Sequence, residues 1–263
     1  MRDKHANLQK NLLRYKEVAV AFSGGVDSTF LLHTACALLG PDKVHAFHAS
    51  SDLIATGETH RVVSTLETLG CHSRIFPLDP FAWPEFVANP PDRCYLCKKK
   101  IYQTFVEAAR ETGICALLDG TNTDDLLEER PGRKALLELQ VHTPLAEAWL
   151  AKREIRLLSR EFSLSTWNAH SVSCLATRIA PGEPITREKI FLVARCEDFL
   201  AQQGFSGVRV RLAGGAATIE VVESDRERIM ENDVISVINA GLFRMGLRDV
   251  CVSRQGRPLP DVT

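Results

Sequence analysis

The chain has 263 residues, of which 45% are hydrophobic and 25% charged, the composition of an ordinary globular protein that needs no disulfide cross-links to fold. Its net charge of −1 argues against a protein that binds nucleic acid through a strongly basic surface. No apolar run approaches the roughly 18 residues of a membrane span, and the N-terminus lacks an apolar signal core. We therefore expect a cytoplasmic protein with reduced cysteines.

The first predicted elements are a short helix over residues 5–15 and a buried, β-branched strand over residues 18–22. A turn with the sequence SGGVDS leads from this strand into a helix that ends at Gly40. We expect Gly24 and Gly25 to take positive φ and to let the backbone approach a ligand, while the helix N-terminus attracts an anion. The residues expected to bind ATP phosphates here are Ser23, Gly24, Gly25, Val26, Asp27 and Ser28.

Within this turn, Asp27 is expected to act through Mg²⁺, because a carboxylate repels a phosphate that it meets directly. No lysine follows the glycines, so the turn is not of the type that handles a γ-phosphate. SGGxDS after a buried strand resembles the pyrophosphate loop of the PP-loop ATP pyrophosphatases. That resemblance implies cleavage of ATP between its α- and β-phosphates.

The next part of the chain alternates predicted strands with predicted helices. These are a strand at residues 44–51, a helix at 58–69, a strand at 72–78, a helix at 98–111 and a strand at 114–118. Such alternation predicts an α/β fold with a doubly wound parallel sheet, whose ligands bind at the carboxyl ends of the strands.

A second polar turn, residues 119–125, leaves the fourth strand at that same edge of the sheet. Its candidates for contacts with ATP are Gly120, Thr121, Asn122 and Asp124. A plain turn rich in asparagine and aspartate would have the same composition, so the spacing leaves both interpretations open. The helix expected over residues 145–162 carries alternating charges that predict a solvated face.

The composition changes near residue 180. The elements predicted after this point form a small α+β unit. They are a helix over residues 187–203, a hairpin of strands at 208–212 and 218–222, a second helix and a strand at 250–253. The second helix begins at a Ser224–Glu227 capping box and runs to about residue 240. We therefore predict two domains, a nucleotide-binding domain at residues 1–180 and a substrate or oligomerisation domain at 181–263.

Three cysteines lie in polar, turn-rich segments, namely Cys94, Cys97 and Cys174. The neighbouring basic residues and a helix start are expected to lower the thiol pKa values of the C-x-x-C pair. This arrangement has three interpretations. They are a zinc site completed by His170, a redox disulfide, and a [4Fe-4S] cluster with one open iron. The remaining cysteines are expected to be small buried hydrophobes: Cys36, Cys71, Cys115, Cys196 and Cys251.

The chain resembles the LarE-type sulfur transferases over nearly its whole length. The motifs that carry the likeness occur in the same order: SGGVDS, HASS, RCYLCKKKIY, DGTNTDD, SCLATRI, GEPIT and VRVR. These PP-loop proteins, whose fold is of the adenine nucleotide α-hydrolase type, supply sulfur for a nickel-pincer nucleotide cofactor. The resemblance implies an ATP-dependent enzyme that adenylates a carboxylate of pyridinium-3,5-biscarboxylic acid mononucleotide, releases pyrophosphate, and forms the thiocarboxylate and AMP. It also implies a homo-oligomer.

The resemblance further implies roles for single residues. One kind of family member sacrifices the sulfur of one cysteine, at the position of Cys174, whereas the other kind holds a cluster with three. With Cys94, Cys97 and Cys174 present, we expect the cluster kind. The residues expected around the substrate phosphate are Arg178, Arg209 and Arg211, with Glu197 and Glu220 as their partners.

Other functions are compatible with parts of this pattern. Certain tRNA 2-thiolation enzymes also combine an SGGxDS loop with three cysteines, but they would be expected to carry basic RNA-binding surfaces, whereas this chain has 32 Lys and Arg against 33 Asp and Glu. An amide-forming PP-loop synthetase would leave the cysteines unexplained. A sensor that binds ATP without cleaving it would retain the nucleotide intact.

Overall fold

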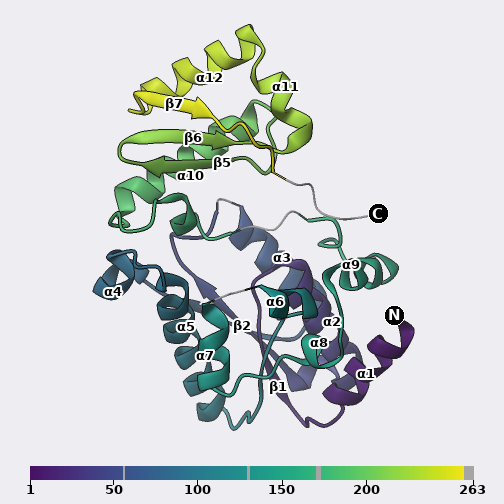
Figure 1. Ribbon diagram of the computed structural model, residues 1–263. Coiled ribbons are helices and arrows are strands. Elements are labelled where there is room, and N and C mark those ends of the chain that lie inside the picture. Colours follow the sequence, from purple (N-terminus) through teal and green to yellow (C-terminus); the bar gives the residue numbers. More distant parts are fainter. Residues whose placement is uncertain (56, 129–130, 170–172, 258–263) are drawn as a thin grey trace.

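The computed structural model describes residues 1–55, 57–128, 131–169 and 173–257 (Figure 1). The N-terminal part contains a four-stranded sheet with the order β3-β2-β1-β4, and all three pairings are parallel. The strands are β1 (Val18–Ala21), β2 (Val44–Ser50), β3 (His72–Pro77) and β4 (Leu117–Asp119). The chain winds outward from β1 in one direction and then returns to its other side, which confirms the predicted doubly wound α/β sheet.

Both faces of the central strand β1 are buried, as expected for a parallel sheet. Val18 and Val20 belong to the core on one face, and Ala19 and Ala21 to the core on the other. The first face is covered by α1 (Arg2–Leu12), α2 (Val26–Leu39), α3 (Glu58–Leu69) and α9 (Lys152–Glu161), and the second by α5 (Arg93–Glu111) and α7 (Gly132–Glu138).

The C-terminal part has a smaller mixed sheet with the order β5-β6-β7, stacked with its helices on the N-terminal part in Figure 1. Its strands are β5 (Arg209–Ala213), β6 (Ala216–Glu220) and β7 (Asp249–Val252), and its long helices are α10 (Arg187–Gln202) and α12 (Asn232–Arg244). The predicted hairpin is confirmed, because β5 and β6 pair antiparallel around Gly214 and Gly215.

The core of this smaller sheet continues into the N-terminal part of the chain. Leu53 and Phe86 belong to the same buried cluster as Val210 and Ile219. The division near residue 180 stays a prediction, and apolar contacts cross it. No helix in the described ranges is both long and apolar enough to span a bilayer.

Two predicted helices are interrupted. In place of one helix over 145–162, the structure has α8 (Pro144–Glu147) and α9. Between them Trp149 has φ +58°, which is not helical, and the Leu150 carbonyl accepts from the Thr123 backbone N–H at 3.0 Å. The expected solvated face is also wrong in part, since Arg156 is only 5% exposed and donates to the Trp167 and Ala169 carbonyls. Tertiary hydrogen bonds therefore override the local pattern.

The second interruption lies in the C-terminal part, where one helix was expected from Ser224 to about residue 240. The structure has the single-turn α11 (Arg226–Ile229) followed by α12, with Glu231 as the N-terminal cap position of α12. Ile229 is fully buried in the C-terminal core, so the break turns α11 toward that core.

An aromatic cluster on the outer side of α2 predicts acid sensitivity. The rings of His5 and His33 lie 5.5 and 5.2 Å from the ring of Phe162. Burial lowers the pKa of both histidines, and His5 adds to the lowering at His33. Because the folded pKa lies below the unfolded value of about 6.5, the stability due to neutral rings is present above that pH and is lost as the pH falls toward the folded pKa.

We therefore expect the free energy of unfolding, measured in urea, to fall between about pH 7 and about pH 5, and His33→Gln to make that fall smaller. His60→Gln, at an exposed histidine, is the matched control. An identical fall in the wild type and His33→Gln would contradict the prediction.

Candidate functional site

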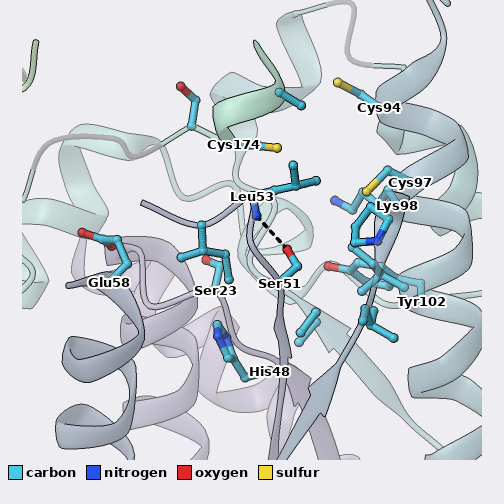
Figure 2. A pocket seen from close by; sticks show the side chains of 18 of the residues that line it. Ser23, His48, Ser51, Leu53, Glu58, Cys94, Cys97, Lys98, Tyr102 and Cys174 are labelled. Carbon is cyan, nitrogen blue, oxygen red and sulfur yellow. Dashed lines mark hydrogen bonds between the residues drawn. The ribbon is translucent and has the colours of Figure 1, made fainter. Parts of the chain in front are cut away.

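A pocket of about 400 Å³ opens at the carboxyl ends of β1 and β2 (Figure 2). Its walls are mostly apolar and come from distant parts of the chain. They include Ser23 of the SGGVDS turn, Ser51 and Leu53 after β2, Cys94, Cys97 and Lys98 of α5, and Cys174 of the loop after α9. The fold thus brings the first residue of the predicted phosphate turn and the three singled-out cysteines to one cavity.

The SGGVDS turn has the predicted strand-to-helix setting. Gly24 has φ +78°, as expected, but Gly25 has φ −77°, so the expectation of positive φ is wrong there: Gly25 is the extended cap residue of α2. The Ser28 hydroxyl donates to the Gly25 carbonyl at 3.2 Å and lies 3.0 Å from the Ser23 hydroxyl. The Val26 side chain is in the core, so only its backbone faces a ligand in the turn.

The turn after β4 serves first as a helix cap. The Asn122 side-chain oxygen accepts from the backbone N–H groups of Asp124 and Asp125 at 2.9 and 3.2 Å, at the start of α6 (Thr123–Leu127). The Asn122 amide also donates to the Asp27 carboxylate at 3.3 Å. Thr121 is buried and donates its backbone N–H to Asp119 at 2.8 Å. The turn is therefore a structural cap that also contacts the SGGVDS turn.

Gly120 lets these two turns approach closely. A Cβ atom at this position would lie 3.0 Å from the Ser28 nitrogen and 3.2 Å from the Asp27 carbonyl carbon. These are backbone atoms, which cannot rotate away as a side chain does. Glycine is required here for contact rather than for an unusual backbone angle.

Lys152, at the start of α9, is a site residue that the sequence interpretation missed. Its ammonium group pairs with the Asp27 carboxylate, and its backbone N–H donates to Asp124 at 2.8 Å. Mg²⁺ at Asp27 would have to share this carboxylate with Lys152 or displace it. The sequence analysis predicted one continuous helix over residues 145–162 and therefore did not predict this contact. In the structure, the break before α9 places Lys152 beside the turn.

Cys94 and Cys97 lie within the first two turns of α5, which begins at Arg93 and not at Lys98 as expected. In Figure 2 their side chains and that of Cys174 border the same pocket. Among the described residues, no group of three or more His, Cys, Asp or Glu side chains is arranged to hold a metal ion. His170, the further ligand of the zinc interpretation, lies outside the described residues.

The expected lowering of thiol pKa values is wrong for Cys97. Burial raises the pKa of this thiol to about 12, and the nearby Cys174 and Cys94 add to the rise. Of the neighbouring basic residues, Arg93 lowers the pKa of Cys97 but does not outweigh burial, and each of the three lysines is paired with a carboxylate. The pairs are Lys98 with Asp119 at 3.3 Å, Lys99 with Glu138 at 2.7 Å and Lys100 with Glu85 at 2.6 Å.

The other cysteines divide into two groups. Cys36 and Cys196 are buried and Cys71 is half-buried, as expected of small hydrophobes. Cys115 and Cys251 are exposed, so the expectation is wrong for both. Cys251 lies on the edge strand β7, whose alternate residues face solvent, and Cys115 lies in the connection before β4.

Arg178 and Glu197 form a buried ion pair next to the pocket. Arg178 is 4% exposed, and its Nε and Nη2 atoms donate to the two Glu197 oxygens at 2.7 and 3.2 Å. Its Nη1 atom donates to the Ser173 hydroxyl at 2.6 Å. The donors of Arg178 are thus engaged within the protein, and they anchor the residue that precedes Cys174.

The two arginines of β5 lie beside that pair. Arg211 forms an ion pair with Glu220 and donates to the Thr177 carbonyl at 2.9 Å. Burial lowers the pKa of Arg209 to about 10, and the nearby Arg257, Arg178 and Arg211 lower it further. Four arginines thus gather near two glutamates, Glu197 and Glu220, which leaves an excess of positive charge at the Thr177 end of the pocket.

Comparison with known proteins supplies a second line of evidence. No family model matches the chain. The chain is 35% identical over 254 residues to the pyridinium-3,5-bisthiocarboxylic acid mononucleotide synthase of Lactiplantibacillus plantarum. The matched residues cover 96% of this chain and 91% of that protein. It is 32% identical over 232 residues to an uncharacterized protein of Synechocystis, covering 88% of this chain and 86% of the relative.

A more distant likeness covers only part of the chain. One of the subunits of the glutamine-hydrolyzing GMP synthase of Pyrococcus furiosus is 27% identical over 157 residues, which is 55% of this chain and 49% of that relative.

The close contact at Gly120 gives a direct test of the site geometry. Gly120→Ala should lower the free energy of unfolding by about 2 kcal/mol, because the new methyl group presses on backbone. Gly25→Ala is the matched control, since its Cβ atom would meet only the Ser23 hydroxyl at 3.4 Å. Urea denaturation of both variants measures the difference, and equal stability would contradict the proposed contact.

Proposed function

The chain belongs to the LarE-type family of sulfur transferases, and on that premise we propose that it adenylates a carboxylate of pyridinium-3,5-biscarboxylic acid mononucleotide and replaces an oxygen of that carboxylate with sulfur. The observation that carries this proposal is the single pocket that borders both the SGGVDS turn and Cys174. A reaction that first activates a carboxylate and then attacks it with sulfur needs both groups at one place.

In the first step, a carboxylate oxygen of the substrate attacks the α-phosphorus of ATP, and the bond to the bridging oxygen of pyrophosphate breaks. The turn from Ser23 to Ser28 and the N-terminus of α2 would bind the phosphates, as a positive helix end favours anions. Asp27 would hold Mg²⁺ together with phosphate oxygens, since carboxylate oxygen suits this ion. Lys152 would then be free to neutralise a phosphate.

In the second step, sulfur attacks the carbonyl carbon of the acyl-adenylate, and AMP leaves with the oxygen that came from the substrate. Adenylation makes this step feasible because AMP is a far better leaving group than oxide. The apolar walls of the pocket, including Leu53, Ile101 and Phe105, would exclude water that competes with sulfur.

The excess positive charge beside Thr177 supports a site for the substrate phosphate. Arg209 and Arg211 would bind it, because guanidinium groups match phosphate oxygens with paired donors. Arg178 is better assigned as a positioning residue, since its donors are held by Glu197 and Ser173. By anchoring Ser173, it would fix the place of Cys174.

Cys94, Cys97 and Cys174 are the donor set that a [4Fe-4S] cluster with one open iron requires, and all three line one pocket. Cysteine thiolates are the ligands that such a cluster takes, so the chemistry of these three residues would suit it. When bound, such a cluster would supply an iron that can coordinate the sulfur to be transferred.

We also propose that the chain assembles as a homo-oligomer and that it acts in the cytoplasm.

A second candidate is sacrificial transfer from Cys174. It is favoured by the position of Cys174 at the same pocket that borders Ser23 of the SGGVDS turn. Here the Cys174 sulfur attacks the acyl-adenylate to form a thioester. Loss of the Cα proton then breaks the Cβ–Sγ bond, which releases the thiocarboxylate and leaves dehydroalanine in the chain.

Spectroscopy of single-cysteine variants separates the two candidates. After anaerobic reconstitution with iron and sulfide, we expect visible and Mössbauer signals of [4Fe-4S] in the wild type and their loss in Cys94→Ala, Cys97→Ala and Cys174→Ala. Cys115→Ala, at an exposed cysteine outside the pocket, is the control. A cluster that forms without Cys174, or one dehydroalanine per product in the intact protein mass, would support sacrificial transfer.

The pairing of Lys152 with Asp27 predicts a role in phosphate chemistry. Lys152→Met should slow substrate-dependent pyrophosphate release by about 100-fold, because one charged donor to the phosphates is lost. Lys152→Arg should recover part of the rate, and Lys10→Met, on the exposed face of α1, is the control. A wild-type rate in Lys152→Met would remove this residue from the mechanism.

A further inference from the structure

His48 is a buried polar residue that the proposed chemistry leaves unused. It lies in β2 and is 3% exposed, and it forms part of the wall of the pocket. In Figure 2 its ring lies below Ser23 and Ser51. The residue belongs to the HASS motif, and no reactive role was expected for it from the sequence.

The hydrogen bond of one ring nitrogen determines the state of the other. Nδ1 of His48 lies 2.8 Å from the backbone carbonyl oxygen of Phe22. A carbonyl oxygen can only accept, so Nδ1 carries the proton and donates. Burial lowers the pKa of His48 and keeps the ring neutral. Nε2 therefore carries no proton and can only accept a hydrogen bond.

That acceptor has no partner within the described part of the chain. Buried polar atoms in folded proteins are almost always hydrogen-bonded, and leaving one unpaired costs free energy. The pocket beside it is otherwise largely apolar, and the SGGVDS turn begins at Ser23, the residue after Phe22. An unpaired buried acceptor beside a phosphate-type turn indicates a ligand that brings a donor.

We infer that Nε2 of His48 accepts a hydrogen bond from the nucleoside part of ATP. The inference rests on the proposed function, which places ATP in this pocket. Phosphate oxygens bound through Mg²⁺ are acceptors and cannot donate to Nε2. The donors that ATP offers are the 6-amino group of adenine and the ribose hydroxyls, so His48 is a specificity residue for one of them.

The Phe22 hydrogen bond makes the inference testable without disturbing the fold. In His48→Asn the side-chain amide can still donate to the Phe22 carbonyl, but nothing replaces the Nε2 acceptor. In His48→Gln the amide oxygen can reach the position of Nε2. The two variants therefore separate the acceptor from the contact that holds the end of β1.

The experiment measures dissociation constants of ATP, inosine triphosphate, 2′-deoxyATP and 3′-deoxyATP for the wild type and both variants, without the second substrate. The wild type should prefer ATP about tenfold over the analogue that lacks the matching donor. His48→Asn should abolish that preference alone, and His48→Gln should retain part of it. The analogue affected identifies the donor.

The inference would be overturned if His48→Asn kept the same ratios of affinity among the four nucleotides as the wild type. A merely structural histidine would give this result, because its loss would weaken the binding of every nucleotide alike. Failure of the wild type to bind any of these nucleotides is a different result. It would overturn the proposed ATP site itself, and the inference with it.

Discussion

At Gly120 the backbone of the turn after β4 rests against the backbone of Asp27 and Ser28, and the arrangement of the site depends on this contact. It lies between the ends of β1 and β4, the neighbouring strands at which the winding of the chain reverses and near which ligands bind in folds of this type. Asn122 of the same turn and Lys152, at the start of α9, add polar contacts to Asp27. A phosphate-type turn is thus braced from both sides before any nucleotide binds.

The smaller sheet completes the site from the opposite direction. Its core shares Leu53 with the segment after β2, and Arg211 donates to the short helix Leu175–Arg178 that follows Cys174. The buried pair of Arg178 and Glu197 ties α10 to this helix. The position of Cys174 relative to the SGGVDS turn therefore depends on packing between the two sheets, and the likeness to the Lactiplantibacillus plantarum synthase also covers both of them.

Sequence reasoning captured what depends on local pattern. The burial of Val18 to Ala21, the turn at Gly24 and the hairpin at Gly214 each follow from a few neighbouring residues. It missed Lys152 because the break before α9 occurs at Trp149, where φ is +58°, and at a hydrogen bond to Thr123, far away in the sequence. It misjudged the Cys97 thiol because lysines near in sequence turn to carboxylates, while the pocket removes the thiol from water.

The central claim is that the substrate carboxylate is adenylated before sulfur attacks it. The most direct measurement follows oxygen-18 from labelled carboxylates of pyridinium-3,5-biscarboxylic acid mononucleotide during turnover with unlabelled ATP. Adenylation predicts one labelled oxygen in the phosphate of each AMP formed, alongside unlabelled pyrophosphate. AMP without label, or ADP and phosphate in place of AMP and pyrophosphate, would contradict the account.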